Sequence, residues 1–197
     1  MTLVVITGGS RSGKSAAAQR LALARSETGA EVVVAVFGSA EGDEEMAARI
    51  DRHRAERPDA FSTVEATDSH SWRERVPDGA LLVIECLGTL AALIMSELYE
   101  ASADNVDASS METALDDEMN QLASWLCGRA GDAIIVTNET GWGVVPVHAS
   151  GRVFRDVVGR ANALLIDRAD AAYLALGGRL LDLHALPRDV TWPPERE

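Results

Sequence analysis

The stretch LVVITGGSRSGKS, residues 3–15, decides the fold of this chain. Its first five residues are mostly apolar and β-branched, which is typical of a buried strand, and Gly8-Gly9 ends that strand. Residues 14–26, KSAAAQRLALARS, then place alanine and leucine at helical spacing. A strand, a glycine loop and a helix in this order match the pattern G-x-x-x-x-G-K-[ST], which in this context binds nucleotide phosphates.

The chemistry of phosphate binding explains each position of this motif. Glycines let backbone N–H groups turn toward a phosphate without Cβ clashes, and the helix N-terminus adds partial positive charge. Lys14 is the only lysine among 197 residues, and its compact ammonium reaches between two phosphates where the planar fork of arginine has a different shape. The alternative, a glycine turn with a chance lysine, is disfavoured by the strand–loop–helix context. We therefore predict a catalytic Lys14, a Mg²⁺ ligand at Ser15, and nucleotide contacts from Gly8, Gly9, Ser10, Arg11, Ser12, Gly13, Lys14 and Ser15.

Strands and helices alternate along the rest of the chain. This alternation predicts an α/β fold of the P-loop NTPase-like (RecA-like) class, with a mostly parallel sheet, helices on both faces and a C-terminal antiparallel hairpin. No internal repeat or linker is visible, so we expect a single domain over 1–185 and a flexible tail over 186–197. Ser109 and Glu112 have capping-box spacing. We predict further strands over 31–37, 63–67, 80–85 and 132–139, helices over 42–58, 86–101, 111–128 and 152–169, and a hairpin over 171–183 that turns at Gly177-Gly178.

The composition excludes several classes of partner. The formal net charge is −13, and an acidic chain repels nucleic acid and anionic membranes. Cys86 and Cys127 are too few for a disulfide scaffold and lack the spacing of metal ligands. The N-terminus lacks the basic region of a signal peptide, and no apolar run reaches the length of a membrane span. We therefore expect a soluble cytoplasmic protein.

A histidine lies among arginines in the predicted helix 42–58. Arg49, His53 and Arg57 are spaced i, i+4, i+8 and share one helix face. Neighbouring guanidinium groups disfavour the histidine cation, which leaves a ring nitrogen able to attack phosphorus while the arginines hold a triphosphate. On spacing alone, however, a solvated helix face is the more frequent outcome for such a pattern.

Carboxylates and a glycine-rich loop follow the central strands. Glu85 ends the strongest apolar strand, where a carboxylate of a P-loop protein binds Mg²⁺ or its water shell; a solvent-facing strand end is the alternative. Asn138 and Glu139 end the next strand. Ligands of open parallel sheets bind beyond the carboxyl ends of the strands, so loop 140–151 is expected to border the site. Trp142 offers this loop a flat apolar face, or covers the core.

Five stretches together resemble a known family, the bifunctional adenosylcobinamide kinase / adenosylcobinamide-phosphate guanylyltransferases of cobalamin biosynthesis. The phosphate loop alone is shared by many families. The arginine–histidine helix, the T-x-E that follows it and the N-E-x-G-x-G-x-V-P loop are far more specific. The matching stretches, in the order of the family, are TGGSRSGKS, DEEMAARIDRHRAERP with TVEA after it, LLVIECLGTL, VTNETGWGVVP and RVFRDVVGRAN.

The resemblance implies two reactions at one site. The first phosphorylates the aminopropanol hydroxyl of adenosylcobinamide with ATP or GTP, and the second transfers GMP from GTP to the resulting phosphate. It implies that His53 is the guanylylated residue, which reverses the preference for a solvated face. It also implies a homotrimer with active sites between subunits. The nucleotide contacts it adds are Gly38, Ser39, Arg54, Arg57, Glu65 and Glu85.

The chain departs from the family pattern at a few positions. Phe37-Gly38-Ser39 stands where the family often has Ala-Thr-Ser, and Gly88 replaces a usual threonine. Trp142 replaces a common methionine, and PVHAS replaces an acidic stretch after the proline. Two alternatives remain open here: an enzyme that keeps only one of the two activities, and a non-catalytic nucleotide-binding switch module.

Overall fold

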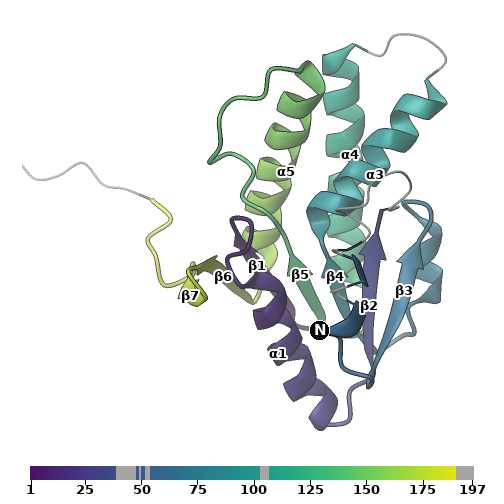
Figure 1. Cartoon of the computed structure of the whole chain (residues 1–197), viewed down its shortest axis with the longest axis vertical. Helices are drawn as coiled ribbons and strands as arrows, with labels where there is room; N and C mark the ends of the chain where they lie inside the picture. The colour runs from purple at the N-terminus through teal and green to yellow at the C-terminus, as the bar shows by residue number, and fades with distance from the viewer. Residues whose placement is uncertain (39–47, 49, 52–53, 103–106, 190–197) are drawn as a thin grey trace, which may run out of the picture.

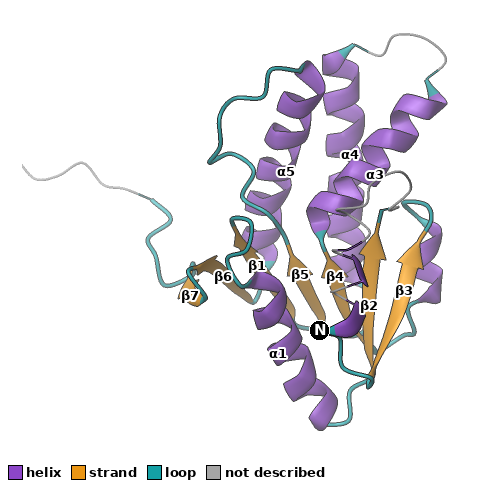
Figure 2. Ribbon diagram, viewed as in Figure 1, coloured by secondary structure: helices purple, strands orange, loops and turns teal. Residues whose placement is uncertain are grey.

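The computed structural model describes residues 1–38, 48, 50–51, 54–102 and 107–189. They form a seven-stranded sheet in the order β3-β2-β4-β5-β1-β6-β7, in which only β7 runs antiparallel. Figure 2 shows the arrows of β2, β3 and β5 pointing toward the same end of the molecule. The strands are β1 (Leu3–Gly8), β2 (Val32–Phe37), β3 (Phe61–Ala66), β4 (Leu81–Glu85), β5 (Ala133–Val136), β6 (Ala171–Leu176) and β7 (Arg179–Asp182).

Helices cover both faces of this sheet, as the alternation of elements predicts. One face packs against α1, and the other packs against α3, α4 and α5, which extend past the strand ends in Figure 1. The two apolar clusters follow the alternation of strand side chains, since Ile6 lies in the α1 cluster and Val5 in the other. The helices are α1 (Lys14–Glu27), α3 (Leu87–Ala101), α4 (Ala108–Gly128) and α5 (Ala149–Arg168), with a short 3₁₀ helix η1 (Ser71–Arg75).

The sequence predicts the central elements closely and some helix starts poorly. The predicted helix 14–26 becomes α1, Lys14–Glu27. The predicted start of α4 is wrong: the helix begins at Ala108, and its cap is Asp107, whose side chain accepts hydrogen bonds from the backbone of Ser109 and Ser110. Aspartate is as good a cap as serine, so the two candidates could not be ranked from the sequence.

Two further differences from the predictions lie near the strand ends. The strand predicted over 132–139 is shorter, because β5 ends at Val136. η1 was not predicted; it buries Trp72, whose ring meets Phe37 and Trp125 edge to face with centroids 5.2 and 5.3 Å away. Aromatic rings favour this arrangement, so η1 closes one side of the core.

Some predictions fall on residues that the structure does not describe. Of the helix predicted over 42–58, residues 48, 50, 51, 54 and 55 are helical. Most of the predicted flexible tail lies outside the described part of the chain. Across the described residues, no helix is both long enough and apolar enough to span a membrane.

Candidate functional site

The loop between β1 and α1 has the backbone of a phosphate cradle. Gly8, Arg11 and Gly13 have φ angles of 147°, 56° and 100°. A Cβ on Gly8 would lie 2.4 Å from the carbonyl oxygen of Ala175. Because L-residues rarely adopt φ angles such as those of Gly8 and Gly13, and a side chain at residue 8 would collide with backbone, the local geometry requires glycine at these two positions.

Lys14 lies inside this loop rather than in solvent. Its side chain is buried, and Nζ donates hydrogen bonds to the carbonyl oxygens of Gly8 (2.8 Å) and Gly9 (2.6 Å). The hydroxyl of Ser12 is also buried and has no hydrogen-bond partner among the described residues. Burying a donor without a partner is unfavourable. A phosphate oxygen in the loop would satisfy this hydroxyl, and it would meet the positive charge of Lys14.

Two predicted carboxylates lie at the same level of the sheet. Glu65 on β3 and Glu85 on β4 both pair in register with Val36 on the strand between them. Residues in register share a face, which here is the face covered by α1. Strand spacing places the two backbones about 10 Å apart. Gly38, which follows β2, is exposed at the same edge with a φ of 102°.

The two predicted arginines meet these carboxylates. Arg54 pairs with Glu65 at the exposed edge of the sheet. Arg57 is more enclosed, since only 10% of its side chain is exposed and its Nη2 lies 3.6 Å from Oε2 of Glu85. Its Nη1 donates to the hydroxyl of Thr63 at 2.8 Å. Two guanidinium groups are therefore held on the α1 face by partners on β3 and β4.

A small cavity joins the start of α1 to this arginine–carboxylate group. Its volume is about 70 Å³. Two of its walls come from Ser15 and Glu85, whose oxygens are the type of ligand that Mg²⁺ prefers. Among the described residues, no cluster of three or more His, Cys, Asp or Glu side chains could hold a metal alone. Ser15 and Glu85 therefore fit a Mg²⁺ that takes its other ligands from nucleotide and water. The lining residues are Ser15, Ala16, Ala18, Gln19, Ala22, Val34, Glu56, Arg57, Phe61, Val83 and Glu85.

Three residues of the sequence prediction lie outside the described part of the chain. They are His53, Arg49 and Ser39. The roles of His53 and Ser39 therefore stay predictions. The structure places their described neighbours Arg54 and Gly38 at the carboxyl edge of the sheet, as described above.

Sequence reasoning missed two supports of the phosphate loop. The turn of the C-terminal hairpin reaches the loop, because Gly178 N–H donates to the carbonyl of Ser12 at 3.0 Å. Behind the loop, Glu139 accepts a hydrogen bond of 2.5 Å from the Thr7 hydroxyl. Asn162 on α5 joins them as a buried polar residue within an apolar helix face. That isolated asparagine is the sequence signal that could have revealed the second support.

The loop between β5 and α5 presents apolar side chains to solvent. Trp142 is 63% exposed, which excludes a role as a cover of the core. Val144, Val145 and Val147 are also exposed. Such a run of exposed apolar residues is typical of a binding or subunit surface. It begins two residues after Thr140, close to Glu139, which follows β5 in the chain.

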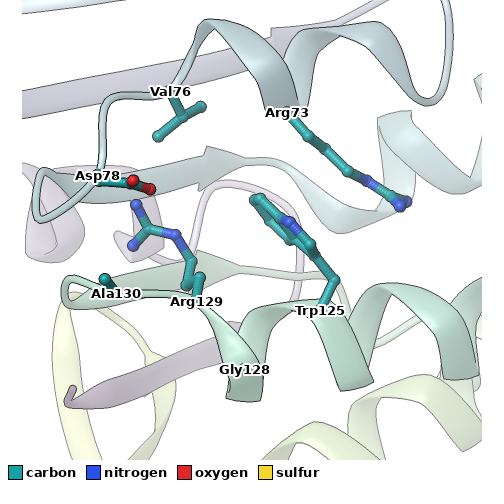
Figure 3. Close-up of a pocket in the computed structure, with 7 residues that line it drawn as sticks. All are labelled: Arg73, Val76, Asp78, Trp125, Gly128, Arg129 and Ala130. Atoms are coloured by element: carbon teal, nitrogen blue, oxygen red, sulfur yellow. The ribbon is translucent and has the colours of Figure 1, made fainter.

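A larger pocket lies at the opposite end of the sheet. It measures about 400 Å³ and is lined by residues that precede β4 and β5 (Figure 3). Arg129 donates to the carbonyls of Ala80, Gly131 and Asp132, and both Arg129 and Arg73 lie against the ring of Trp125. Burial lowers the pKa of both guanidinium groups, against the opposing effect of nearby carboxylates. These arginines tie backbone and aromatic groups together, and the phosphate loop is remote from them.

The fold and the phosphate loop between β1 and α1 define the class of protein: a nucleotide-binding α/β protein with a P-loop. A solved ATPase of a bacterial type III secretion system has the same fold, with a TM-score of 0.51 and 12% identity over 88% of this chain and 50% of that one. The comparison with family models gives a narrower assignment than this class. Residues 4–183 match the model of the cobinamide kinase / cobinamide phosphate guanyltransferase family, and the chain belongs to it.

Curated relatives agree with this assignment. The chain is 36% identical over 181 residues to the bifunctional adenosylcobalamin biosynthesis protein CobU of Salmonella typhimurium, covering 89% of this chain and 96% of that protein. It is 32% identical over 186 residues to the protein of the same description, CobP, of Pseudomonas aeruginosa, covering 93% and 98%. The resemblance stated from the sequence is confirmed.

Proposed function

We propose that this chain carries out both family reactions at the phosphate loop: it phosphorylates adenosylcobinamide and then transfers GMP to the product. The observation that supports this most directly is the position of Lys14. Its ammonium lies within a loop that contains positive-φ residues at the start of α1, and the same loop carries the Ser12 hydroxyl, which finds no hydrogen-bond partner in the described part of the chain. That arrangement suits the charge that develops on transferred phosphoryl groups.

In the kinase step, the acceptor hydroxyl attacks the γ-phosphorus of ATP or GTP. A new P–O bond forms to the acceptor, the bond to the β-phosphate oxygen breaks, and the nucleoside diphosphate leaves as the hydroxyl loses its proton. Lys14 and the loop N–H groups bind the phosphate oxygens and orient them. Ser15 and Glu85 would hold Mg²⁺, which supplies further positive charge between the phosphates.

In the second step, His53 attacks the α-phosphorus of GTP. An N–P bond forms, pyrophosphate leaves, and the phosphate of the acceptor then displaces the histidine to give adenosylcobinamide-GDP. Arg54 and Arg57, which the structure holds against Glu65 and Glu85, would exchange part of these contacts for phosphate oxygens. Family membership and the sequence position of His53 support this role.

The exposed apolar residues of the β5–α5 loop support the expected homotrimer with sites between subunits. Trp142 and Val144, at 63% and 95% exposure, would be covered by a neighbouring copy or by the corrinoid. Sedimentation analysis of the wild type and of Val144→Asp distinguishes a subunit interface from a corrinoid contact. If the active site is shared between subunits, Val144→Asp should dissociate into monomers and should also lose activity.

The test of the two-step chemistry uses GTP labelled at the α- or the γ-phosphorus. We expect α-label, and no γ-label, to stay on the denatured protein as an acid-labile adduct that His53→Ala lacks. Separate assays of each half-reaction, with adenosylcobinamide or its phosphate, decide whether both activities are present. Turnover without any covalent label would refute the role of His53, and failure to bind magnesium–GTP would refute the proposal as a whole.

A further inference from the structure

A buried polar group lies behind the phosphate loop, where β1, β5 and α5 meet. We call it the strand-end cluster; its members are Thr7, Thr137, Asn138, Glu139 and Asn162. Thr7, Thr137 and Asn162 have 2%, 0% and 3% of their surface exposed. Polar groups at such depth are unfavourable unless they are hydrogen-bonded. The interior around them is otherwise apolar, so the cluster needs a specific explanation.

Side-chain hydrogen bonds connect the members of the cluster to one another. Thr137 donates its hydroxyl to Oδ1 of Asn162 at 2.6 Å. Nδ2 of Asn162 donates to the carbonyl of Asn138 at 3.0 Å and, more weakly, to Oε1 of Glu139 at 3.4 Å. Thr7 donates to the same Oε1 at 2.5 Å. Oε1 of Glu139 is therefore the acceptor at which the contributions of β1 and α5 converge.

The cluster continues into the phosphate loop through the backbone. The N–H of Glu139 donates to the carbonyl of Gly8 at 3.2 Å. That same carbonyl accepts the 2.8 Å hydrogen bond from Nζ of Lys14. One carbonyl oxygen thus joins the residue that follows β5 to the lysine of the loop. A shift of Glu139 would move Gly8, and with it an anchor of the Lys14 side chain.

The cluster also fixes where the exposed β5–α5 loop begins. β5 ends at Val136, and beyond it the backbone of Glu139 keeps one hydrogen bond to β1, from its N–H to the carbonyl of Gly8. The side chains of Asn162 and Thr7, whose own backbones belong to α5 and β1, add the remaining contacts to Asn138 and Glu139. Glu139 therefore stands between the phosphate side of the site and the loop that carries Trp142.

We infer that Glu139 is a positioning residue for group transfer. Through Oε1 it holds the phosphate loop and the β5–α5 loop in one geometry, so that the acceptor meets the phosphates in line. The inference rests on the function proposed above, because it assumes phosphate transfer at this loop. A misplacement of reacting groups by 1 Å lowers a rate by about 100-fold, so a residue of this kind affects kcat more than nucleotide affinity.

The test compares Glu139→Ala with Glu139→Gln in the kinase half-reaction. Glutamine keeps a carbonyl oxygen that can accept from Thr7 and Asn162, whereas alanine removes it. We expect Glu139→Ala to lower kcat by about 10- to 100-fold, with the dissociation constant of magnesium–GTP changed less than about 3-fold. We expect Glu139→Gln to restore kcat to within about 3-fold of the wild type. An equal loss in both variants would show that the negative charge acts rather than the hydrogen bonds, and would overturn the inference.

A double-mutant cycle tests whether Asn162 acts through Glu139. Asn162→Ala alone is expected to lower kcat, and combining it with Glu139→Ala should add little, because both variants break the same connection. Additive losses would contradict a shared role. Thermal melting of every variant, with assays run well below its midpoint, keeps unfolded protein from being counted as lost activity.

The chain offers a matched control at the other end of the same strand. Asp132 precedes β5, and its carboxylate accepts hydrogen bonds from Thr2 N–H at 2.8 Å and from Arg25 at 2.6 Å. Asp132→Ala should lower stability and leave kcat unchanged. If it lowers kcat as much as Glu139→Ala does, the effect is general loosening of β5 and the inference fails. The wild type separates the two proposals: an inactive wild type refutes the function, whereas an active wild type with an unaffected Glu139→Ala refutes only the inference.

Discussion

Each end of the sheet holds a cation on backbone carbonyls, and the two ends differ in what surrounds that cation. At the carboxyl ends, Lys14 donates to two backbone carbonyls within a loop of positive-φ residues. At the amino ends, Arg129 donates to three carbonyls and lies against Trp125. The larger pocket, about 400 Å³ against about 70 Å³, lies at the amino ends.

The comparison shows that neither a cation bound to backbone carbonyls nor a large pocket identifies the site in this molecule. What distinguishes the carboxyl ends is the glycine loop at the start of α1, whose backbone conformation and helix N-terminus suit an anionic phosphate. At the amino ends the arginine is already matched to carbonyls by the fold. We therefore expect changes at the two ends to separate activity from stability.

The largest effect is expected for Lys14→Arg. The buried ammonium fits between the carbonyls of Gly8 and Gly9, and a planar guanidinium does not. We predict that kcat/KM falls by about 10²- to 10³-fold in both half-reactions, in the range found for loss of one transition-state donor. Steady-state kinetics and calorimetric titration with magnesium–GTP measure this. Arg129→Lys is the control at the amino ends and should keep its activity; a similar loss there would remove the distinction between the two ends.

A pair of glycines gives the next largest effect. A Cβ on Gly8 would lie 2.4 Å from the Ala175 carbonyl, and one on Gly131 would lie 2.5 Å from the Ala80 carbonyl. Each alanine variant should lower the free energy of unfolding by about 2–3 kcal/mol, through overpacking and backbone strain. Only Gly8→Ala should also lose nucleotide binding. Urea unfolding measures the loss of stability, and titration with magnesium–GTP measures nucleotide binding. A Gly131→Ala protein that fails to bind nucleotide would contradict the expectation that the amino ends affect stability alone.

Arg129→Ala should affect stability alone. It removes a donor from three carbonyls, of which that of Asp132 keeps the N–H of Leu82, and we expect the free energy of unfolding to fall by about 2 kcal/mol. For a chain of this length the melting temperature should drop by about 4–8 °C. The matched variant is Arg160→Ala, whose ion pairs with Glu112 and Asp116 are about half exposed and should contribute less than about 1 kcal/mol. A kcat defect in folded Arg129→Ala would assign the amino ends a role in catalysis.

The smallest effect is expected for Asp68, which lies between β3 and η1 in the segment that leads from the carboxyl ends of the strands back to the amino ends. Hydrogen bonds from the side chain and backbone of Ser71, and from the backbone of His70, lower the pKa of Asp68 to about 2 from an ordinary 3.8. The unfolded chain therefore binds more protons between these values, so this contribution to stability is present above about pH 4 and is lost as the pH falls toward 2. Asp68→Asn should flatten the decline of stability over that window, as measured by urea unfolding. An unchanged slope would show that the hydrogen bonds of Asp68 do not stabilise the folded state.

The sequence predicts those parts of the site whose backbone conformation depends on residues that are close together in the chain. The motif from Gly8 to Ser15 fixes its own backbone, and the predicted strand and helix on either side are confirmed within one residue. Glu85 was located because it ends an apolar strand. The strand-end cluster was not predicted, because Thr7 and Glu139 are 132 residues apart. No local pattern states that β1 lies beside β5, so contacts between them had to come from the structure.

The hairpin contact has a consequence for how the protein is made. β6 pairs with β1 up to Gly8 and Ala175, and Gly178 donates to the carbonyl of Ser12. The nucleotide cradle therefore combines two segments that lie far apart in the sequence. A nascent chain stalled before residue 178 has emerged lacks this contact and should hold nucleotide poorly, so that GTP capture follows synthesis of the hairpin.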